Sequence, residues 1–395
     1  MFLSHIDERL LTWATPYQAK VLEAINRLGS GRAASRELGI DNAAIVRSMQ
    51  RLKTQAALRG YSTDHDMTRT VPNGFAVKGV STYYNKEGKP AGQWVKSRAD
   101  DVAREAAFRE AMAGMADELP RLAPIAAPSP GCDKLLNLFT LTDCHVGMLA
   151  WHKEGGHDWD LKIAEDTLVA CFAGMIERSP KAGTAIVNQL GDFLHFDGME
   201  AVTPTNRHLL DADGRFPKIS RVAVRIMRRV IDMALATHDK VHVICAEGNH
   251  DIASSTWLQI ALTIAYENEP RVMIDDSALP FYKYRFGKNL LGFHHGHTGR
   301  WESLPMMFGQ MYRRDFGETE HSYIHTGHRH HVSEKDSMGT RLIQHATLAA
   351  RDAYAARHGY LAARQAVAMT YHADYGEWAR ATVTPEMMAD IPPTV

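Results

Sequence analysis

Apolar runs rich in β-branched residues recur between residues 135 and 330, and polar residues follow each of them. The runs are LLNLFTLT (residues 135–142), AIVNQL (185–190), VHVICA (241–246), NLLGF (289–293) and SYIHT (322–326). Short runs of this kind are typical of buried strands in a parallel sheet. Asp, Asn or His follows each run, so the sequence predicts an α/β fold with a site at the carboxyl edge of its strands.

The amino-terminal region has a different pattern, in which apolar residues recur at helical spacing. A first helix is expected to end at Gly29, a second to end at Gly39, and a third to begin after Asp41, which is a suitable cap. Leu22, Ile25 and Leu28 mark the first helix, and Ala33, Ala34 and Leu38 the second. Ile45, Met49 and Leu52 would lie on the buried side of the third. Three short helices with a tight turn suggest a helix-turn-helix domain.

Between the two regions, the sequence predicts a hairpin and a connector. Residues 77–84 and 91–96 alternate apolar and polar side chains around an Asn-Lys-Glu-Gly turn, which predicts a β-hairpin that would form a wing on the helical domain. An Ala-rich helix over 100–119 and a Pro/Ala linker over 120–131 follow. The expected domains are therefore 1–62, 63–100, 101–131 and 132–395.

Two further segments complete the coarse prediction. Val222, Ile226, Val230 and Met233 are spaced for a helix with arginines around them, and packing against a sheet is favoured over a role as a DNA track. The runs RLIQHA (341–346) and AVAMTYHA (366–373) are expected to be late strands that close a second sheet.

Composition excludes some classes of protein. A 395-residue chain with 45% hydrophobic and 23% charged residues is typical of a soluble globular protein. The formal net charge of −1 gives no global attraction to nucleic acid or membrane, so such a partner must meet a local patch. Four cysteines without a C-x-x-C spacing favour a reducing, cytoplasmic setting, and the lack of an apolar run of 18 residues predicts no membrane span and no membrane partner.

The amino-terminal helices carry the local positive charge that DNA binding needs. Between Tyr17 and Gly60, eight lysines and arginines stand against three acids. Arg47 and Arg51 are four residues apart on the third helix, so they share a face and would reach phosphates or guanine edges. The alternative is a trihelical bundle that binds only protein. DNA is the favoured partner.

The polar residues that follow the five runs form an ordered series: D-x-H, G-D, G-N-H-D, H-G-H and G-H-x-H. This series resembles the calcineurin-like metallophosphoesterase superfamily over residues 135–330. The resemblance implies a four-layer α-β-β-α sandwich that holds two metal ions. The helices and hairpin before it resemble the amino-terminal region of phage and prophage metallophosphoesterases, so the complete fold class is this sandwich with an amino-terminal helix-turn-helix, winged-helix-like domain.

The resemblance also implies which residues hold the ions. Asp192 would bridge them, and a hydroxide held between them would attack phosphorus in line. Mixed carboxylate and imidazole ligands favour Mn, with Fe, Zn or Mg as alternatives. The implied ligands are Asp143, His145 and His330 for the first ion, Asn249, His295 and His328 for the second, and Asp192 for both.

Four other residues have expected roles in the chemistry. By the resemblance, His250 lies beside the metals and either protonates the leaving oxygen or stabilises the transition state, with Asp251 orienting its ring. His195, in GDFLHFD, is a candidate for touching a substrate phosphate. By the resemblance, His295 is chosen as the ligand over His294 and His297 because it directly precedes Gly. His297 is kept as a possible partner of the substrate or as a further metal ligand.

The complete sequence predicts a phage-type phosphodiesterase acting on DNA, near the DNA-repair nuclease branch of the superfamily. A helix-turn-helix that tethers the substrate would raise its effective concentration at the metals. Two alternatives stay open. The first is a phosphomonoesterase or a small or cyclic-nucleotide phosphodiesterase, and the second is a DNA-binding regulator without catalysis.

Overall fold

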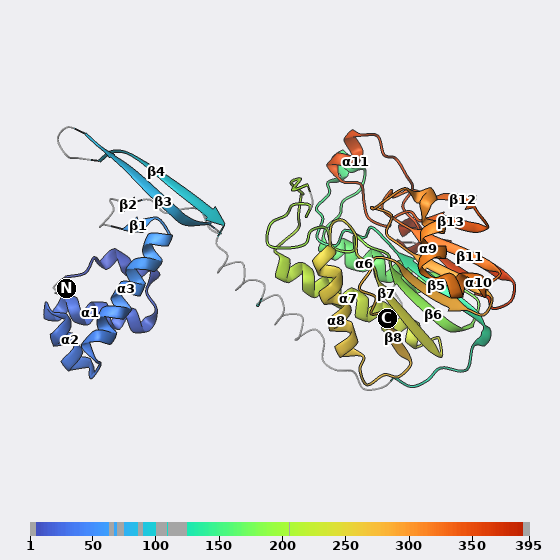
Figure 1. Ribbon diagram of the computed structural model, residues 1–395, viewed down its shortest axis with the longest axis horizontal. Helices are drawn as coiled ribbons and strands as arrows, with labels where there is room; N and C mark the ends of the chain where they lie inside the picture. The colour runs from blue at the N-terminus through green and yellow to red at the C-terminus, as the bar shows by residue number, and fades with distance from the viewer. Residues whose placement is uncertain are drawn as a thin grey trace. The chain divides into compact units, whose positions relative to one another are not determined.

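The computed structural model describes residues 5–62, 67–68, 75–85, 90–99, 109, 125–204 and 206–389. The chain divides into two compact units, Met1–Ala106 and Ala107–Val395 (Figure 1). Each unit has its own hydrophobic core. The helix predicted over residues 100–119 lies outside the described residues except at position 109, as does the linker before residue 125. Within the described ranges, none of the helices combines the length and apolar character needed to cross a membrane.

The three amino-terminal helices form as predicted: α1 (Pro16–Leu28), α2 (Gly31–Leu38) and α3 (Asn42–Leu58). Thr15 and Gln18 form a reciprocal capping box at the start of α1, and Asp41 accepts a hydrogen bond from the N–H of Ala44 at the start of α3. A 3₁₀ helix, η1 (Glu8–Trp13), precedes them. The buried core of the unit includes Val21, Leu22, Ile25, Ile45, Met49 and Leu52.

The pairing of the two predicted hairpin strands is also confirmed, whereas residues 86–88 of the predicted turn lie outside the described residues. Strand β3 (Phe75–Tyr84) pairs antiparallel with β4 (Pro90–Ala99), and Val80 lies opposite Val95. Each strand is slightly longer than the alternation alone indicated. A two-residue pair, β1 (Tyr61–Ser62) and β2 (Met67–Thr68), lies between the helices and the hairpin in sequence.

The second unit is built on two sheets. The six-stranded sheet has the order β15-β14-β5-β6-β7-β8, in which β5 to β8 are parallel. Its strands are β5 (Cys132–Leu141), β6 (Ala182–Gln189), β7 (Lys240–Cys245), β8 (Val272–Ile274), β14 (Ala366–His372) and β15 (Gly376–Val383).

The five-stranded sheet has the order β12-β13-β11-β10-β9, with β10, β11 and β13 parallel. Its strands are β9 (Tyr282–Phe286), β10 (Asn289–Phe293), β11 (His321–Thr326), β12 (Ser333–Ser337) and β13 (Thr340–Gln344). The prediction that both late runs close the second sheet was wrong for one of them. Strand β13 lies in this sheet, but β14 pairs with β5 in the six-stranded sheet, because a strand's own sequence does not specify its neighbour.

Alternating side chains create the layers. On β5 and β6, Leu138 and Ile186 face the other sheet, whereas Phe139 and Val187 face helices. Those helices are α6 (Leu161–Arg178), α7 (Phe216–Leu235) and α8 (Ile252–Ala265). Helix α9 (Leu304–Met311) packs on the outer face of the five-stranded sheet. The order of layers in the second unit is therefore helix, sheet, sheet, helix, as predicted (Figure 1).

Helix α7 packs against the sheet, as favoured from its sequence. Twelve of its side chains are buried. On its other side, Arg225 donates two hydrogen bonds of 2.7 Å to Glu165 of α6. Shorter helices complete the unit: α5 (His152–Gly155), η3 (Trp301–Ser303), α10 (Arg313–Gly317), α11 (Ala353–Arg357) and α12 (Pro385–Ala389).

Candidate metal centre

The five polar motifs meet at one place. Strands β5, β6 and β7 are parallel neighbours in one sheet, and β10 and β11 are parallel neighbours in the other. Parallel neighbours end at the same edge, so the loops that follow them converge. Two groups of side chains with metal-ligand chemistry lie there, Asp143 with His145 and His330, and Asp192 with His295 and His328.

The backbone at these residues is unusual. In the part of the chain that the structure describes, seven residues other than glycine have positive φ, and five of them are the candidate ligands Asp143, His145, Asp192, His328 and His330. A residue with a side chain in the left-handed region costs roughly 1–3 kcal/mol. Such strain persists only where the surrounding structure over-determines it, so its concentration here indicates a functional centre.

The glycines of the motifs allow the strand ends to approach closely. A Cβ on Gly248 would lie 2.8 Å from Cγ of Asp192, and one on Gly327 would lie 2.6 Å from Oδ2 of Asp143. A Cβ on Gly191 would lie 2.5 Å from Nδ1 of His295. Each glycine therefore makes room for a ligand from another motif.

In the first group, Oδ1 of Asp143 lies 3.1 Å from Nε2 of His330, and Nε2 of His145 lies 3.4 Å from the same nitrogen. The carboxylate of Asp143 is fixed from behind, because the hydroxyl of Thr142 donates to Oδ2 at 2.7 Å and the N–H of His328 donates at 2.9 Å. Its remaining acceptor capacity faces the two imidazoles.

In the second group, Nε2 of His295 lies 3.2 Å from Oδ2 of Asp192 and 4.0 Å from Oδ1 of Asp143, so it links the two groups. Its Nδ1 donates to the carbonyl of Leu190 at 2.8 Å, which turns Nε2 toward the carboxylates. Oδ1 of Asn249 is buried without a hydrogen-bond partner, and Nε2 of His295, although close to Asp192, lacks a well-aligned one. Unpartnered buried ligand atoms beside carboxylates fit a bound cation.

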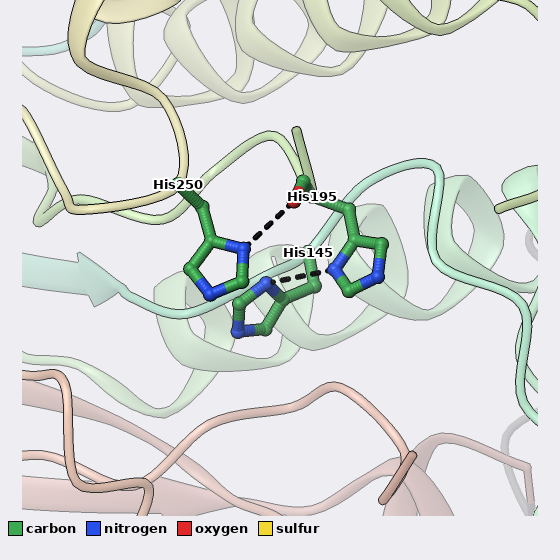
Figure 2. A group of neighbouring side chains, drawn as sticks. All are labelled: His145, His195 and His250. Carbon is green, nitrogen blue, oxygen red and sulfur yellow. Dashed lines mark hydrogen bonds between the residues drawn. The ribbon is translucent and has the colours of Figure 1, made fainter. Parts of the chain in front are cut away.

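A third histidine group adjoins the first (Figure 2). Nδ1 of His195 lies 3.3 Å from Nδ1 of His145, and the rings of His195 and His250 stack with centroids 5.6 Å apart. Nδ1 of His250 donates to the main-chain carbonyl of His195 at 2.7 Å. The structure thus brings both residues to the centre, with the carbonyl of His195 orienting the ring of His250.

Asp251 occupies a different place from the expected one. Its carboxylate does not orient the ring of His250 but accepts four main-chain N–H bonds, from residues 192, 193, 194 and 248, at 2.7–3.1 Å. The expected contact was wrong because the loop after β6, distant in sequence, presents its N–H groups to this carboxylate. Asp251 therefore holds the two loops that carry Asp192 and Asn249 together.

The three histidines of the H-H-G-H segment have different surroundings and different roles. His294 is buried against Phe281 and bonds to Thr298 and to the N–H of Gly296, which is a structural role. His295 joins the second group, as predicted. His297 contributes no atom to the two ligand groups; its ring lies 5.4 Å from that of His295, and it lines a cavity.

Electrostatics favour a cation at the centre. Burial acts to raise the pKa of Asp143 and Asp192, but the neighbouring histidines outweigh it and hold both below their ordinary values. Burial opposes protonation of His295, yet Asp192 and Asp143 raise its pKa to about 10. The carboxylates thus draw a proton onto a buried imidazole, and a divalent ion would displace that proton and supply the same compensation.

Two cavities open from the centre. One, of about 710 Å³, is lined by His145, Asp192, Arg329 and most of the segment 349–364. The other, of about 590 Å³, is lined by Thr203, Asn206, residues 208–211 and His297. They share six residues: His195, Asn249, His250, His328, Asp352 and Tyr354. A substrate that passes through both would cross the metal centre. The sequence provides no expectation for segment 349–364, an alanine-rich connection whose only signal is the pair of tyrosines, Tyr354 and Tyr360.

Comparison with known proteins gives low similarity. No protein-family model matches the chain, and no curated protein matches it. Among solved structures, it is similar to an archaeal phosphodiesterase (12% identity, TM-score 0.33, 63% of this chain and 99% of that chain). It is also similar to a predicted phosphoesterase from Streptococcus pneumoniae (10%, TM-score 0.27, 63% and 97%) and to Vps29 from Entamoeba histolytica complexed with Zn²⁺ (12%, TM-score 0.26, 64% and 99%). TM-scores of this size carry no argument about function, which rests on the geometry of the centre.

Proposed function

We propose that the chain is a two-metal phosphodiesterase of the calcineurin-like type that acts on DNA. The observation that carries the proposal is the pair of adjacent ligand groups, Asp143 with His145 and His330, and Asp192 with His295 and His328, linked through His295. A single structural ion needs only one such group. Two groups at the junction of two cavities fit a catalytic centre better.

The donor set fits two divalent ions, and manganese is the preferred one. The residues that would hold them are Asp143, His145, Asp192, Asn249, His295, His328 and His330. Bound ions of this kind supply Lewis acidity and lower the pKa of a water molecule in phosphoester hydrolysis. The strained backbone and the glycine contacts preorganise the ligands, so little rearrangement is needed on binding.

His250 is the group that moves a proton. Its Nδ1 donates to the carbonyl of His195, which fixes the tautomer and leaves Nε2 to exchange a proton in the cavities that the ring lines. In the protonated ring, Nε2 would donate to the leaving oxygen of a phosphodiester. His195 would act mainly by orienting His250, and His297 by contacting the substrate in the second cavity.

DNA is the proposed substrate because of the first unit. Arg47 and Arg51 are exposed on α3, on the side opposite the buried Ile45, Met49 and Leu52. This arrangement supports docking of α3 on DNA as a recognition helix, with the hairpin as its wing. The substrate would then be tethered to a chain that carries the catalytic centre.

The test is cleavage of labelled single- and double-stranded DNA by the full chain with Mn²⁺, with a generic phosphodiester alongside. Asp192→Asn is compared with Asp166→Asn, an exposed aspartate of α6. DNA cleavage lost only in Asp192→Asn is the expected result. Hydrolysis of the generic ester with intact DNA would instead support the small-substrate alternative, and Mn²⁺-independent or Asp192-independent cleavage would overturn the proposal. Arg47→Ala with Arg51→Ala is expected to weaken DNA binding, measured by fluorescence anisotropy.

A further inference from the structure

The segment between β13 and β14 forms one wall of the larger cavity. It is held in place at several points. The main-chain carbonyl carbon of Arg351 would lie 3.2 Å from a Cβ on Gly155 of α5, so the two backbones are in close contact. The guanidinium of Arg364 lies 5.3 Å from the ring centroid of buried Trp159, and its Nε donates to the carbonyl of Leu348 at 2.8 Å. The wall is therefore a built part of the cavity.

Three rings are gathered on this wall. The ring centroids of Tyr354 and His358 are 4.1 Å apart, and those of His358 and Tyr360 are 6.0 Å apart, with planes within 21°. Despite this clustering, Tyr354 is 61% exposed and Tyr360 is 58% exposed. Tyr354 lines both cavities and Tyr360 lines the larger one. Exposed ring faces are thus presented to the space beside the metal centre.

The rest of the wall suits a flat organic group followed by a phosphate. Five alanines also line the cavity, at positions 349, 350, 355, 362 and 363. Arg329 and Arg351 line the same cavity and provide positive charge. Nucleobases stack on aromatic side chains whatever their sequence, whereas arginines attract the backbone phosphates.

We propose that Tyr354 and Tyr360 stack an unpaired base of the substrate next to the phosphate that is cleaved. The centre would then select a nucleic acid strand that is single-stranded at the point of cleavage, because the bases of an intact duplex are already stacked and paired. The inference rests on the proposed function in placing the phosphate at the metals. It adds the form of the substrate and the residues that recognise it.

The test uses the full chain with Mn²⁺ and two oligonucleotides of equal length, one with bases and one abasic throughout. The measured quantity is the ratio of kcat/KM for the oligonucleotide with bases to kcat/KM for the abasic one. Tyr354→Ala and Tyr360→Ala are each expected to lower this ratio by about 5- to 150-fold, the range that base stacking on an aromatic side chain spans. Tyr354→Phe keeps the ring and is expected to keep the ratio.

Tyr375→Ala is the matched control. Tyr375 is 69% exposed and stacks on His372 with centroids 4.5 Å apart, so it has the same chemistry as the Tyr354 pair. It follows the end of β14 that pairs with Leu135, whereas the centre lies beyond the opposite end of β5. Its substitution is expected to leave the ratio unchanged.

Different failures separate the two proposals. Three results would each overturn the inference without contradicting the proposed phosphodiesterase activity. They are a ratio near one in the unsubstituted chain, no effect of Tyr354→Ala and Tyr360→Ala, and cleavage of an intact duplex as fast as the single strand. Absence of any phosphodiester hydrolysis would overturn the proposed function. In that case, the affinities of the same two oligonucleotides, measured by fluorescence anisotropy, test the inference. Tighter binding of the strand with bases, lost in Tyr354→Ala, supports it, and equal binding of the two strands overturns it.

Discussion

Asp251→Asn is expected to destabilise the second unit substantially. Each carboxylate oxygen of Asp251 accepts two main-chain N–H bonds, Oδ1 from Asp192 and Gly248 and Oδ2 from Phe193 and Leu194. An asparagine amide has one oxygen, so in either orientation its NH₂ faces two N–H donors that lose their partner. Hydrogen bonds to a charged group contribute about 1.5–3 kcal/mol each, which gives a loss of about 3–6 kcal/mol.

The lower part of that range is expected. Burial, and after it the charge of Asp192, raises the pKa of Asp251 to about 7, so the wild-type carboxylate is ionised at a cost that asparagine does not have. Urea unfolding in EDTA at pH 8, where Asp251 is ionised, measures the free energy of unfolding. The transition of the second unit is identified in a separate titration without EDTA, as the transition that Mn²⁺ shifts.

Asp197→Asn is the control. Its carboxylate accepts two N–H bonds of 2.7 Å at the start of α8, one per oxygen, so asparagine loses one, and a fall of about 1 kcal/mol is expected. A change below about 1 kcal/mol in Asp251→Asn, or one no larger than in Asp197→Asn, would refute the claim that Asp251 holds the ligand loops together.

Three further predictions concern other parts of the second unit. Gly248→Ala places a Cβ against the Asp192 carboxylate, so Mn²⁺ affinity by calorimetry is expected to fall at least tenfold; unchanged affinity contradicts the close-approach argument. Burial lowers the pKa of His345 to about 3, so between about pH 6.5 and 3 only the unfolded state carries its proton, and stability falls as pH falls. His345→Gln should reduce the slope of the free energy of unfolding against pH by about 1.4 kcal/mol per pH unit, measured by urea unfolding from pH 6 to 4. An equal slope in both proteins refutes the assignment. Glu165→Gln breaks the bidentate ion pair with Arg225, which is partly exposed. Thermal unfolding should therefore show a fall of only about 1 kcal/mol in the free energy of unfolding, while phosphodiester hydrolysis is unaffected. A large loss of hydrolysis would contradict the purely structural role and link α6 to the centre.

Several elements were predictable from local sequence because local forces determine them. Gly29 and Asp41 mark helix ends through backbone conformation and capping, and both act within a few residues. The five apolar runs became β5, β6, β7, β10 and β11 because each is long enough and apolar enough to be buried as a strand. The convergence of their polar ends then follows from parallel pairing.

Other features depended on contacts between distant segments. The partner of β14 is β5, a segment more than 200 residues earlier in the chain. Three of the four partners of the Asp251 carboxylate are main-chain groups of residues 192–194. Neither contact can be predicted from the local sequence pattern. The placement of Tyr354 and Tyr360 in the same cavity as His145 has the same origin, since it requires the β13–β14 connection to pack on α5.

The sequence by itself therefore determined which residue types stand at the ends of which strands, because hydrophobic burial and turn chemistry act locally. The tertiary structure decided how those ends are used. It holds five ligands at positive φ, orients the rings through main-chain carbonyls, and adds the aromatic wall. These features come from packing between layers, in which each side chain's position depends on neighbours that the chain supplies only after it has folded.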